Sequence, residues 1–222
     1  MNSDPVYRYL IFDLDGTLID SKDGIVKSVN HALRACGFPE LDEGRDLSWF
    51  VGPPLRDGFK ELVGATDNAL VEKLVASYRE RYSRVGLFES ALYPGIAELL
   101  NDLFDHDMVL ILVTSKLTTY ARRILENFEL ASLFDKTIGS ELDGTRSTKE
   151  EAIKLVFSAY GGPTSMYVMI GDRGDDIIGA RKNSIDSIGV LYGYGTSSEV
   201  TESNPTFVAK TVEDIRTMLL PT

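Results

Sequence analysis

The 222-residue sequence has little cysteine, little histidine and no long hydrophobic run. A single cysteine, Cys36, excludes an internal disulfide and is typical of a reducing compartment. Two histidines, His31 and His106, are too few and too far apart for a histidine-rich metal site. The aliphatic run Met108–Val113 is too short to cross a bilayer, and Tyr9–Phe12 is too short for a signal peptide. We therefore expect a soluble, cytoplasmic protein.

Positive charge is also scarce. Lysine and arginine number 23 against 34 aspartates and glutamates, which gives a net charge of −11 with histidine neutral. Binding to phosphate backbones or anionic lipids needs clustered lysine and arginine, so neither a nucleic acid nor a membrane is expected as the main partner. The apolar fraction of 43% is that of an ordinary globular protein, and the length suits one large domain or two modest ones.

Short apolar segments rich in β-forming residues recur along the chain and predict buried strands. They are Tyr7–Phe12, Met108–Val113, Phe134–Ile138, Met166–Ile170, Ile185–Leu191 and a short last one at Phe207–Val208. Amphipathic helical patterns alternate with most of these strands. They begin at Pro94 or cover Ala121–Phe128, Ala152–Tyr160, Asp175–Asn183 and Val212–Leu219. This alternation predicts an α/β fold, a Rossmann-like parallel sheet with helices on both faces.

The segment from residue 18 to residue 90 breaks the alternation because it contains no convincing strand. Apolar residues at helical spacing predict two helices there, with apolar faces over Ile25–Leu33 and Leu70–Tyr78. We therefore expect residues 1–17 and 91–222 to form the Rossmann-like core and residues 18–90 to form an inserted α-helical cap. The insertion directly follows the densest polar motif of the chain, which indicates a lid over a site.

Seven polar residues share one expected location, the edge of the sheet where parallel strands end and ligands bind. They are Asp13, Asp15, Thr114, Ser115, Lys149, Asp172 and Asp176. Two or three carboxylates bind a hard dication such as Mg²⁺, and a carboxylate can also accept a phosphoryl group. A second acid two residues on, Asp15, could protonate a leaving alkoxide and then deprotonate the attacking water. Ser115 and Lys149 could neutralise the charge of a transferring phosphoryl group.

In the order Asp13–Thr17, Thr114-Ser115, Lys149 and Gly171–Asp176, these motifs resemble the four motifs of the haloacid dehalogenase superfamily of Mg²⁺-dependent phosphohydrolases. The resemblance covers nearly the whole chain, and the four motifs together are highly specific. It implies a sheet with strand order 5-4-1-2-3, which would bring the first, second and fourth motifs together. It also implies a helical cap that closes over a small phosphorylated metabolite.

The resemblance further implies roles for the acidic residues. Asp13 would be the nucleophile and a metal ligand. Asp15 would be the general acid and base, and its backbone carbonyl would also bind the metal. Asp172 would bind Mg²⁺, and Asp176 would support the ion, directly or through water. Asp175 makes the last motif more acidic than the family pattern requires, so whether it replaces or accompanies Asp176 stays open.

The same resemblance implies residues that bind the substrate. Ser115 and Lys149 would hold the transferring phosphoryl group, with Thr114 beside Ser115. In the expected cap, Gly52 and Arg56 are candidates for substrate contact. An exposed turn and a solvated helix residue explain those two positions equally well.

Three segments carry a finer resemblance to phosphoglycolate phosphatase-like or 5′-nucleotidase-like members: Phe50–Leu55, Gly139–Thr145 and Gly189–Gly195. The stretch Glu141–Thr145 also repeats the first motif with glutamate in the first place, and we expect a loop near the site. The substrate stays open between phosphoglycolate, a nucleoside monophosphate and a sugar phosphate. A sugar phosphomutase of the same superfamily and a non-enzymatic phospho-accepting regulatory module remain alternatives, and the protein could be a monomer or a homodimer.

Overall fold

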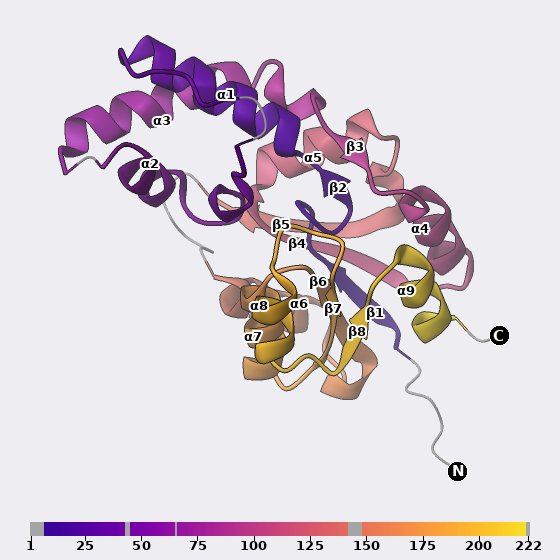
Figure 1. Cartoon of the computed structure of the whole chain (residues 1–222). Coiled ribbons are helices and arrows are strands. Elements are labelled where there is room, and N and C mark those ends of the chain that lie inside the picture. The colour runs from indigo at the N-terminus through magenta and orange to yellow at the C-terminus, as the bar shows by residue number, and fades with distance from the viewer. Residues whose placement is uncertain (1–6, 43–44, 65, 142–147, 221–222) are drawn as a thin grey trace. The chain divides into compact units, whose positions relative to one another are not determined.

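The structure, a computed structural model, describes residues 7–42, 45–64, 66–141 and 148–220. The chain divides into two compact units (Figure 1). The core unit consists of Met1–Ile19 with Leu92–Thr222, and the inserted unit consists of Asp20–Ala91.

A six-stranded sheet forms the centre of the core unit. Its strands, in spatial order, are β5 (Phe134–Ser140), β4 (Val109–Leu117), β1 (Tyr9–Phe12), β6 (Tyr167–Gly171), β7 (Asp186–Val190) and β8 (Phe207–Ala209). All neighbouring strands run parallel. When the strands of this sheet are counted in chain order, β7, β6, β1, β4 and β5 are strands 5, 4, 1, 2 and 3, so these five follow the expected order. The short strand β8 pairs with β7 and adds a sixth strand at the β7 edge of the sheet. The α/β fold class is thus confirmed, and the five-strand order was incomplete.

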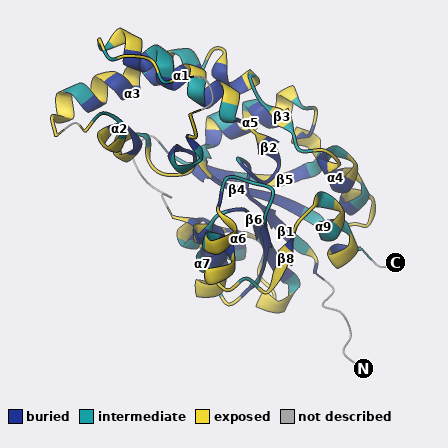
Figure 2. Cartoon of the chain, in the orientation of Figure 1, coloured by how far each residue is buried: buried dark blue, intermediate teal, exposed yellow. Residues whose placement is uncertain are grey.

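The central strands are apolar along their whole length because both faces of the sheet are covered. All five residues of β6 are buried, as are the last three of β1 (Figure 2). Helices α6 (Lys149–Tyr160) and α7 (Gly174–Lys182) lie on one side of the sheet, and α4 (Ile96–Asp105) and α9 (Val212–Leu219) lie on the other (Figure 1). Helix α5 (Thr118–Asn127) packs against β4 and β5. The six-residue helix α8 (Ser197–Glu202) was not predicted.

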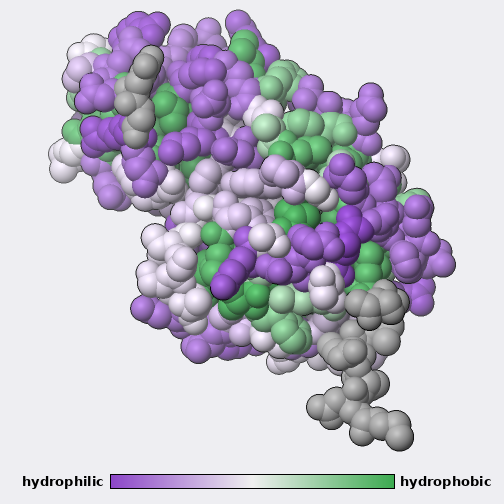
Figure 3. Space-filling model, turned by 45° about the vertical axis from the view of Figure 1, so that its right-hand side comes forward, coloured by the Kyte–Doolittle hydropathy of each residue, from purple (hydrophilic) through white to green (hydrophobic). Residues whose placement is uncertain are grey.

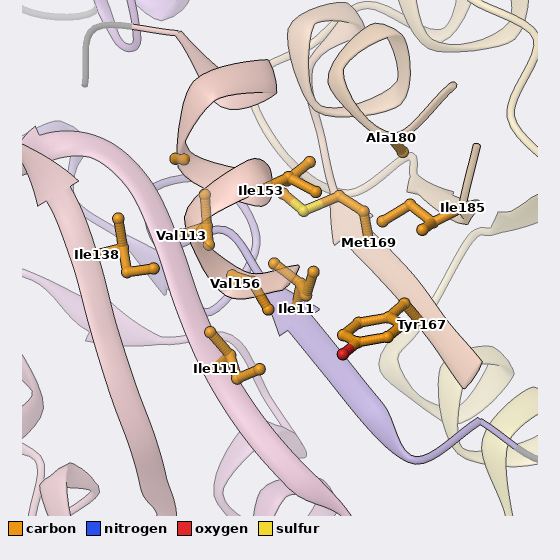
Figure 4. Close-up of a cluster of buried hydrophobic side chains, with 11 residues drawn as sticks. Ile11, Ile111, Val113, Ile138, Ile153, Val156, Tyr167, Met169, Ala180 and Ile185 are labelled. Carbon is orange, nitrogen blue, oxygen red and sulfur yellow. The ribbon is translucent and has the colours of Figure 1, made fainter. Parts of the chain in front are cut away.

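A cluster of buried side chains joins α6 and α7 to the sheet (Figure 4). Its members are Ile11, Ile111, Val113, Ile138, Ala152, Ile153, Val156, Tyr167, Met169, Ala180 and Ile185. Full burial of an aliphatic or aromatic side chain contributes about 1.5–3 kcal/mol. Because Ile153 and Val156 belong to α6, this cluster fixes the first turn of that helix, and with it Lys149, against the sheet.

The inserted unit is helical within its described residues. It contains α1 (Lys22–Ala35), α2 (Leu55–Val63) and α3 (Asn68–Tyr82), with short 3₁₀ turns at Ser48–Phe50 and Gly86–Phe88. Helix α1 packs against α3, and α2 also packs against α3. The Phe50 and Phe59 rings meet with centroids 5.3 Å apart. The nine-residue helix α2 was missed because it follows two prolines and contains Gly58, which weakens the helical pattern.

Two very short strands were also missed. They are β2 (Ile19–Asp20) and β3 (Ala91–Leu92), which pair with each other in a two-stranded sheet. Each spans two residues, which is too short for an alternating hydrophobic pattern to be recognised. The expectation that residues 18–90 contain no strand was therefore wrong for β2.

Hydrophilic residues cover much of the face shown in Figure 3. Over the part of the chain that the structure describes, no helix combines the length and the apolar character needed to cross a membrane.

Candidate active site

Three buried carboxylates lie together at the carboxyl edge of the core sheet. Asp13 directly follows β1, Asp172 follows β6, and Asp176 lies in the first turn of α7. The parallel register pairs Phe12 with Ile170, so the chain leaves both strands at the same edge. The exposed fraction is 6% for Asp13 and 0% for the other two aspartates. One carboxylate oxygen from each residue lies within 4.8 Å of the others, so the three form one cluster.

Lys149 reaches this carboxylate cluster from the start of α6. Its Nζ lies 2.5 Å from Asp13 Oδ1 and 2.7 Å from Asp176 Oδ1, and it donates a hydrogen bond to the Val113 carbonyl at 2.9 Å. A Cβ on Gly179 of α7 would lie 2.8 Å from the Lys149 Cβ, so glycine there lets the two helices approach closely. The three carboxylates and this ammonium together carry a formal charge of −2.

The electrostatics of the cluster follow from burial and from this excess of negative charge. Burial raises the pKa of Asp13 to about 8; Lys149 opposes the rise, and the two other carboxylates add to it. Burial, followed by the charge of Asp176, raises the pKa of Asp172 to about 6. Burial alone would lower the pKa of Lys149, but Asp13 and Asp176 together raise it above its ordinary value. A buried set of oxygen ligands short of positive charge fits a hard dication such as Mg²⁺.

The loop after β7 holds Asp172 in place. The backbone N–H groups of Tyr194 and Gly195 donate to Asp172 Oδ2 at 2.8 and 3.2 Å. The Thr17 hydroxyl donates to Oδ1 at 3.3 Å. A Cβ at Gly193 would lie 2.4 Å from the Asp172 Cβ, so this position must be glycine for the loop to close over the carboxylate.

Asp15 lies outside the carboxylate cluster, in the turn that follows β1. Gly16 has φ 86°, which favours glycine, and its N–H donates to the Ile19 carbonyl at 2.9 Å to close the turn. The Asp15 carboxylate forms an ion pair with Lys116, with Asp15 Oδ2 and Lys116 Nζ 3.1 Å apart. The two aspartates of the first motif therefore have different lysine partners, since Asp13 contacts Lys149.

The two adjacent hydroxyl residues, Thr114 and Ser115, differ in burial. Strand β4 continues to Leu117, beyond the expected end at Val113, so both residues belong to the strand. Thr114 is 4% exposed and accepts a hydrogen bond from the Lys116 N–H at 3.2 Å. The Ser115 residue is exposed, and its carbonyl accepts a hydrogen bond from the Ser140 hydroxyl at 2.8 Å. Of these two adjacent residues, Thr114 is therefore the buried one.

The remaining candidates are in the inserted unit or outside the described residues. Gly52 lies in an exposed turn with φ 109°. Arg56, on α2, forms an ion pair with Glu72 at 2.5 Å, and both side chains are about half exposed. The part that Gly52 and Arg56 take in substrate binding stays a prediction. Of the expected loop Glu141–Thr145, the structure describes only Glu141, whose carboxylate accepts a hydrogen bond from the Thr118 hydroxyl at 3.0 Å; residues 142–145 lie outside the described residues.

Burial distinguishes the two neighbouring aspartates that the sequence left open. Asp175 is exposed, whereas Asp176 is fully buried in the carboxylate cluster.

Two features of the site were not predicted from the sequence. The ion pair of Lys116 could have been suspected from a lysine directly after the hydroxyl pair, but the Tyr194 and Gly195 contacts come from backbone groups and have no side-chain signal.

The comparisons with known proteins agree with this geometry. The chain belongs to the haloacid dehalogenase-like hydrolase family, whose model matches residues 10–190.

Its similarity to individual members extends over nearly the whole chain. It is 40% identical over 213 residues to a protein from Pseudomonas aeruginosa named 5′-nucleotidase, covering 96% of each chain. It is 36% identical to the tyrosine-protein kinase PtkA of Mycobacterium tuberculosis, covering 96% of this chain and 72% of that protein. The solved structure of a predicted phosphatase from Clostridium acetobutylicum superposes with a TM-score of 0.86 at 39% identity, covering 95% of this chain and 97% of that one. Other relatives, at 27 to 32% identity, are named phosphoglycolate phosphatase.

Proposed function

We propose that this protein is a Mg²⁺-dependent phosphatase that hydrolyses phosphate monoesters of small metabolites through a phosphoaspartate on Asp13. The observation that carries the proposal is the buried cluster of Asp13, Asp172 and Asp176 with Lys149 inserted between two of its members. Its position at the carboxyl edge of a parallel sheet is where this fold class binds ligands. Family membership and the names of the relatives support the same reaction class.

In the first step, a carboxylate oxygen of Asp13 attacks the phosphorus atom. The new Asp13 O–P bond forms as the ester P–O bond breaks, and Asp15 gives a proton to the leaving oxygen. In the second step, water attacks the phosphorus, Asp15 takes the proton of that water, and the Asp13 O–P bond breaks to release phosphate. Both steps need in-line positioning and charge neutralisation more than any further covalent chemistry.

The three clustered aspartates would hold the Mg²⁺ ion, together with the backbone carbonyl of Asp15. When bound, the ion neutralises charge on the phosphoryl oxygens. Lys149 is fixed between Asp13 and Asp176, so its ammonium would lie beside the same oxygens and orient the Asp13 carboxylate. This arrangement lets an anionic phosphate approach a protein whose net charge is −11.

A hydroxyl from the end of β4 would complete the phosphoryl site. Thr114 fits this role better than Ser115, because Thr114 is buried next to Val113, whose carbonyl contacts Lys149, whereas Ser115 is exposed. A buried, positioned donor contributes more to transition-state stabilisation than one exposed to water. Ser115 remains a candidate for the same contact.

The substrate class is a small phosphorylated metabolite, and the names of relatives favour a nucleoside monophosphate or phosphoglycolate. A sugar phosphate is the third candidate. The inserted unit would act as a cap over the substrate, with Gly52 and Arg56 as its contact residues. A screen of phosphate monoesters ranked by kcat/KM would identify the substrate, because that ratio measures discrimination. We further infer a cytoplasmic location, as a monomer or homodimer.

The test is turnover with Mg²⁺ and p-nitrophenyl phosphate, comparing the wild type with Asp13→Asn. We expect repeated turnover in the wild type and a loss on the order of 10⁴-fold or more in Asp13→Asn, with no acid-trapped phosphoprotein. The exposed neighbour Asp175→Asn is the matched control and should keep wild-type activity. Normal activity in Asp13→Asn would exclude the nucleophile, and a single stable phosphorylation without turnover would support the regulatory module instead. Transfer of the phosphoryl group to a second sugar hydroxyl would support a phosphomutase.

A further inference from the structure

Lys116 forms a second, nearly buried ion pair at the edge of the sheet. Its side chain is 9% exposed and that of Asp15 is 13% exposed, with 3.1 Å between Lys116 Nζ and Asp15 Oδ2. At such low exposure the attraction between two charges is screened far less than on the surface. Removing one partner leaves the other charge poorly solvated, so the contact strongly favours one position of the Asp15 carboxylate.

The backbone on both sides of this ion pair is well fixed. The Lys116 N–H donates to the Thr114 hydroxyl at 3.2 Å, and Leu117 is paired with Ser140 of β5. On the other side, Asp15 forms an isolated bridge with Ile19 within the turn that follows β1. Lys116 therefore reaches Asp15 from a paired strand and anchors the Asp15 carboxylate through the ion pair.

We propose that Lys116 is a positioning residue that holds the Asp15 carboxylate in place to take the proton of the attacking water. The proposal rests on the proposed function, in which Asp15 is the base of the second step. In this step the water oxygen bonds to phosphorus, the Asp13 O–P bond breaks, and the proton passes from water to Asp15.

This assignment divides the work of the two lysines. Lys149 contacts the nucleophile Asp13 and so affects both formation and hydrolysis of the phosphoaspartate. Lys116 contacts Asp15 and so affects the step that depends most on Asp15. With p-nitrophenyl phosphate, whose leaving group needs little protonation, that step is hydrolysis of the phosphoaspartate.

The experiment compares wild type, Lys116→Met and Lys116→Arg with p-nitrophenyl phosphate and Mg²⁺ by stopped flow. We expect Lys116→Met to lower kcat on the order of 10- to 100-fold, within the range attributed to a general base, while kcat/KM changes by less than about 3-fold. A burst of p-nitrophenol equal to the protein concentration should precede the slow turnover. Lys116→Arg should restore much of kcat. Lys154→Met, which removes an exposed lysine paired with Glu150, is the matched control.

Two further measurements separate positioning from a purely structural effect. Adding Lys116→Met to Asp15→Asn should lower kcat no further, because the two residues act through one interaction. Lys116→Gln gives a second variant if Lys116→Met unfolds. An equal fall of kcat and kcat/KM without a burst, or additive effects in the double variant, would overturn the proposal. A wild type that hydrolyses no phosphate ester would instead reject the proposed function.

Discussion

Replacing Asp172 by asparagine should stabilise the metal-free protein while it abolishes catalysis. Asparagine has nearly the same shape, so its carbonyl oxygen can keep the backbone hydrogen bonds from Tyr194 and Gly195. Its NH₂ group can then donate to the Thr17 hydroxyl, which now donates to Asp172. The substitution thus removes one of three clustered negative charges without leaving a buried polar group unsatisfied.

The magnitude follows from the pKa of Asp172. Burial, then the charge of Asp176, raises it from 3.8 to about 6. Because its pKa is higher in the folded state, this carboxyl group binds its proton more tightly there than in the unfolded state. Its contribution to the free energy of unfolding is therefore fully present below pH 3.8 and is lost as the pH rises through 6. The shift corresponds to about 3 kcal/mol as an upper limit at pH 8 and to roughly half of that at pH 5. Because the clustered groups titrate together, we expect a gain of about 1–3 kcal/mol in Asp172→Asn at pH 8.

The assay is thermal unfolding in excess chelator at pH 5 and pH 8. At roughly 2–4 °C per kcal/mol for a chain of this size, Tm should rise by about 2–12 °C at pH 8 and by less at pH 5. Asp175→Asn is the matched control, and it should lose up to about 1 kcal/mol because its charge favours the start of α7. Added Mg²⁺ should raise Tm in the wild type and have little effect in Asp172→Asn. A metal-free Asp172→Asn that melts below the wild type at pH 8, or a gain equal at both pH values, would refute the reasoning.

Two other predictions concern the surroundings of the carboxylate cluster. Thr114→Val should lower kcat/KM by about 10-fold or more and Ser115→Ala by less than about 3-fold, because Thr114 is buried and Ser115 is exposed. If steady-state assays show the larger loss in Ser115→Ala, the phosphoryl contact belongs to Ser115 instead. Gly193→Ala should destabilise the protein by about 1–3 kcal/mol and weaken Mg²⁺ binding, because a Cβ there would lie 2.3 Å from the Gly16 carbonyl oxygen. Calorimetric titration that finds unchanged Mg²⁺ affinity would contradict the second prediction.

Much of the core unit could be predicted because its strands are short apolar runs separated by amphipathic helices. The run Tyr7–Phe12, for example, ends where β1 ends, at the residue before Asp13. The elements that were not predicted lack this pattern of apolar strands and amphipathic helices. Strands β2 and β3 have two residues each, and α2 contains a glycine and only nine residues. Their conformation depends on tertiary contacts rather than on a local pattern.

The candidate site was predictable where a residue type has few alternative uses. Two acids close together at the end of a buried strand, Asp13 and Asp15, indicated the first motif, and Asp172 followed from its place at the end of β6. The sequence could not distinguish Asp175 from Asp176, or Thr114 from Ser115, because adjacent residues of a helix or strand point in different directions. Which member of each pair is buried depends on how the element packs, and the structure shows that Asp176 and Thr114 are the buried members. The ion pair of Lys116 with Asp15 depends on the extension of β4, which the sequence pattern did not reveal.

The position of β1 has a consequence for biosynthesis. Tyr9 of this strand pairs with Val109 and with Tyr167, which are 100 and 158 residues further along the chain. Sheets assembled from such distant segments fold slowly, and β1 lacks its second neighbour, β6, until the chain has been synthesised beyond Tyr167. No N-terminal fragment that ends before Asp172 can bring that carboxylate to Asp13. A nascent or truncated chain that ends before Asp172 would therefore lack the carboxylate cluster that the proposed metal site needs.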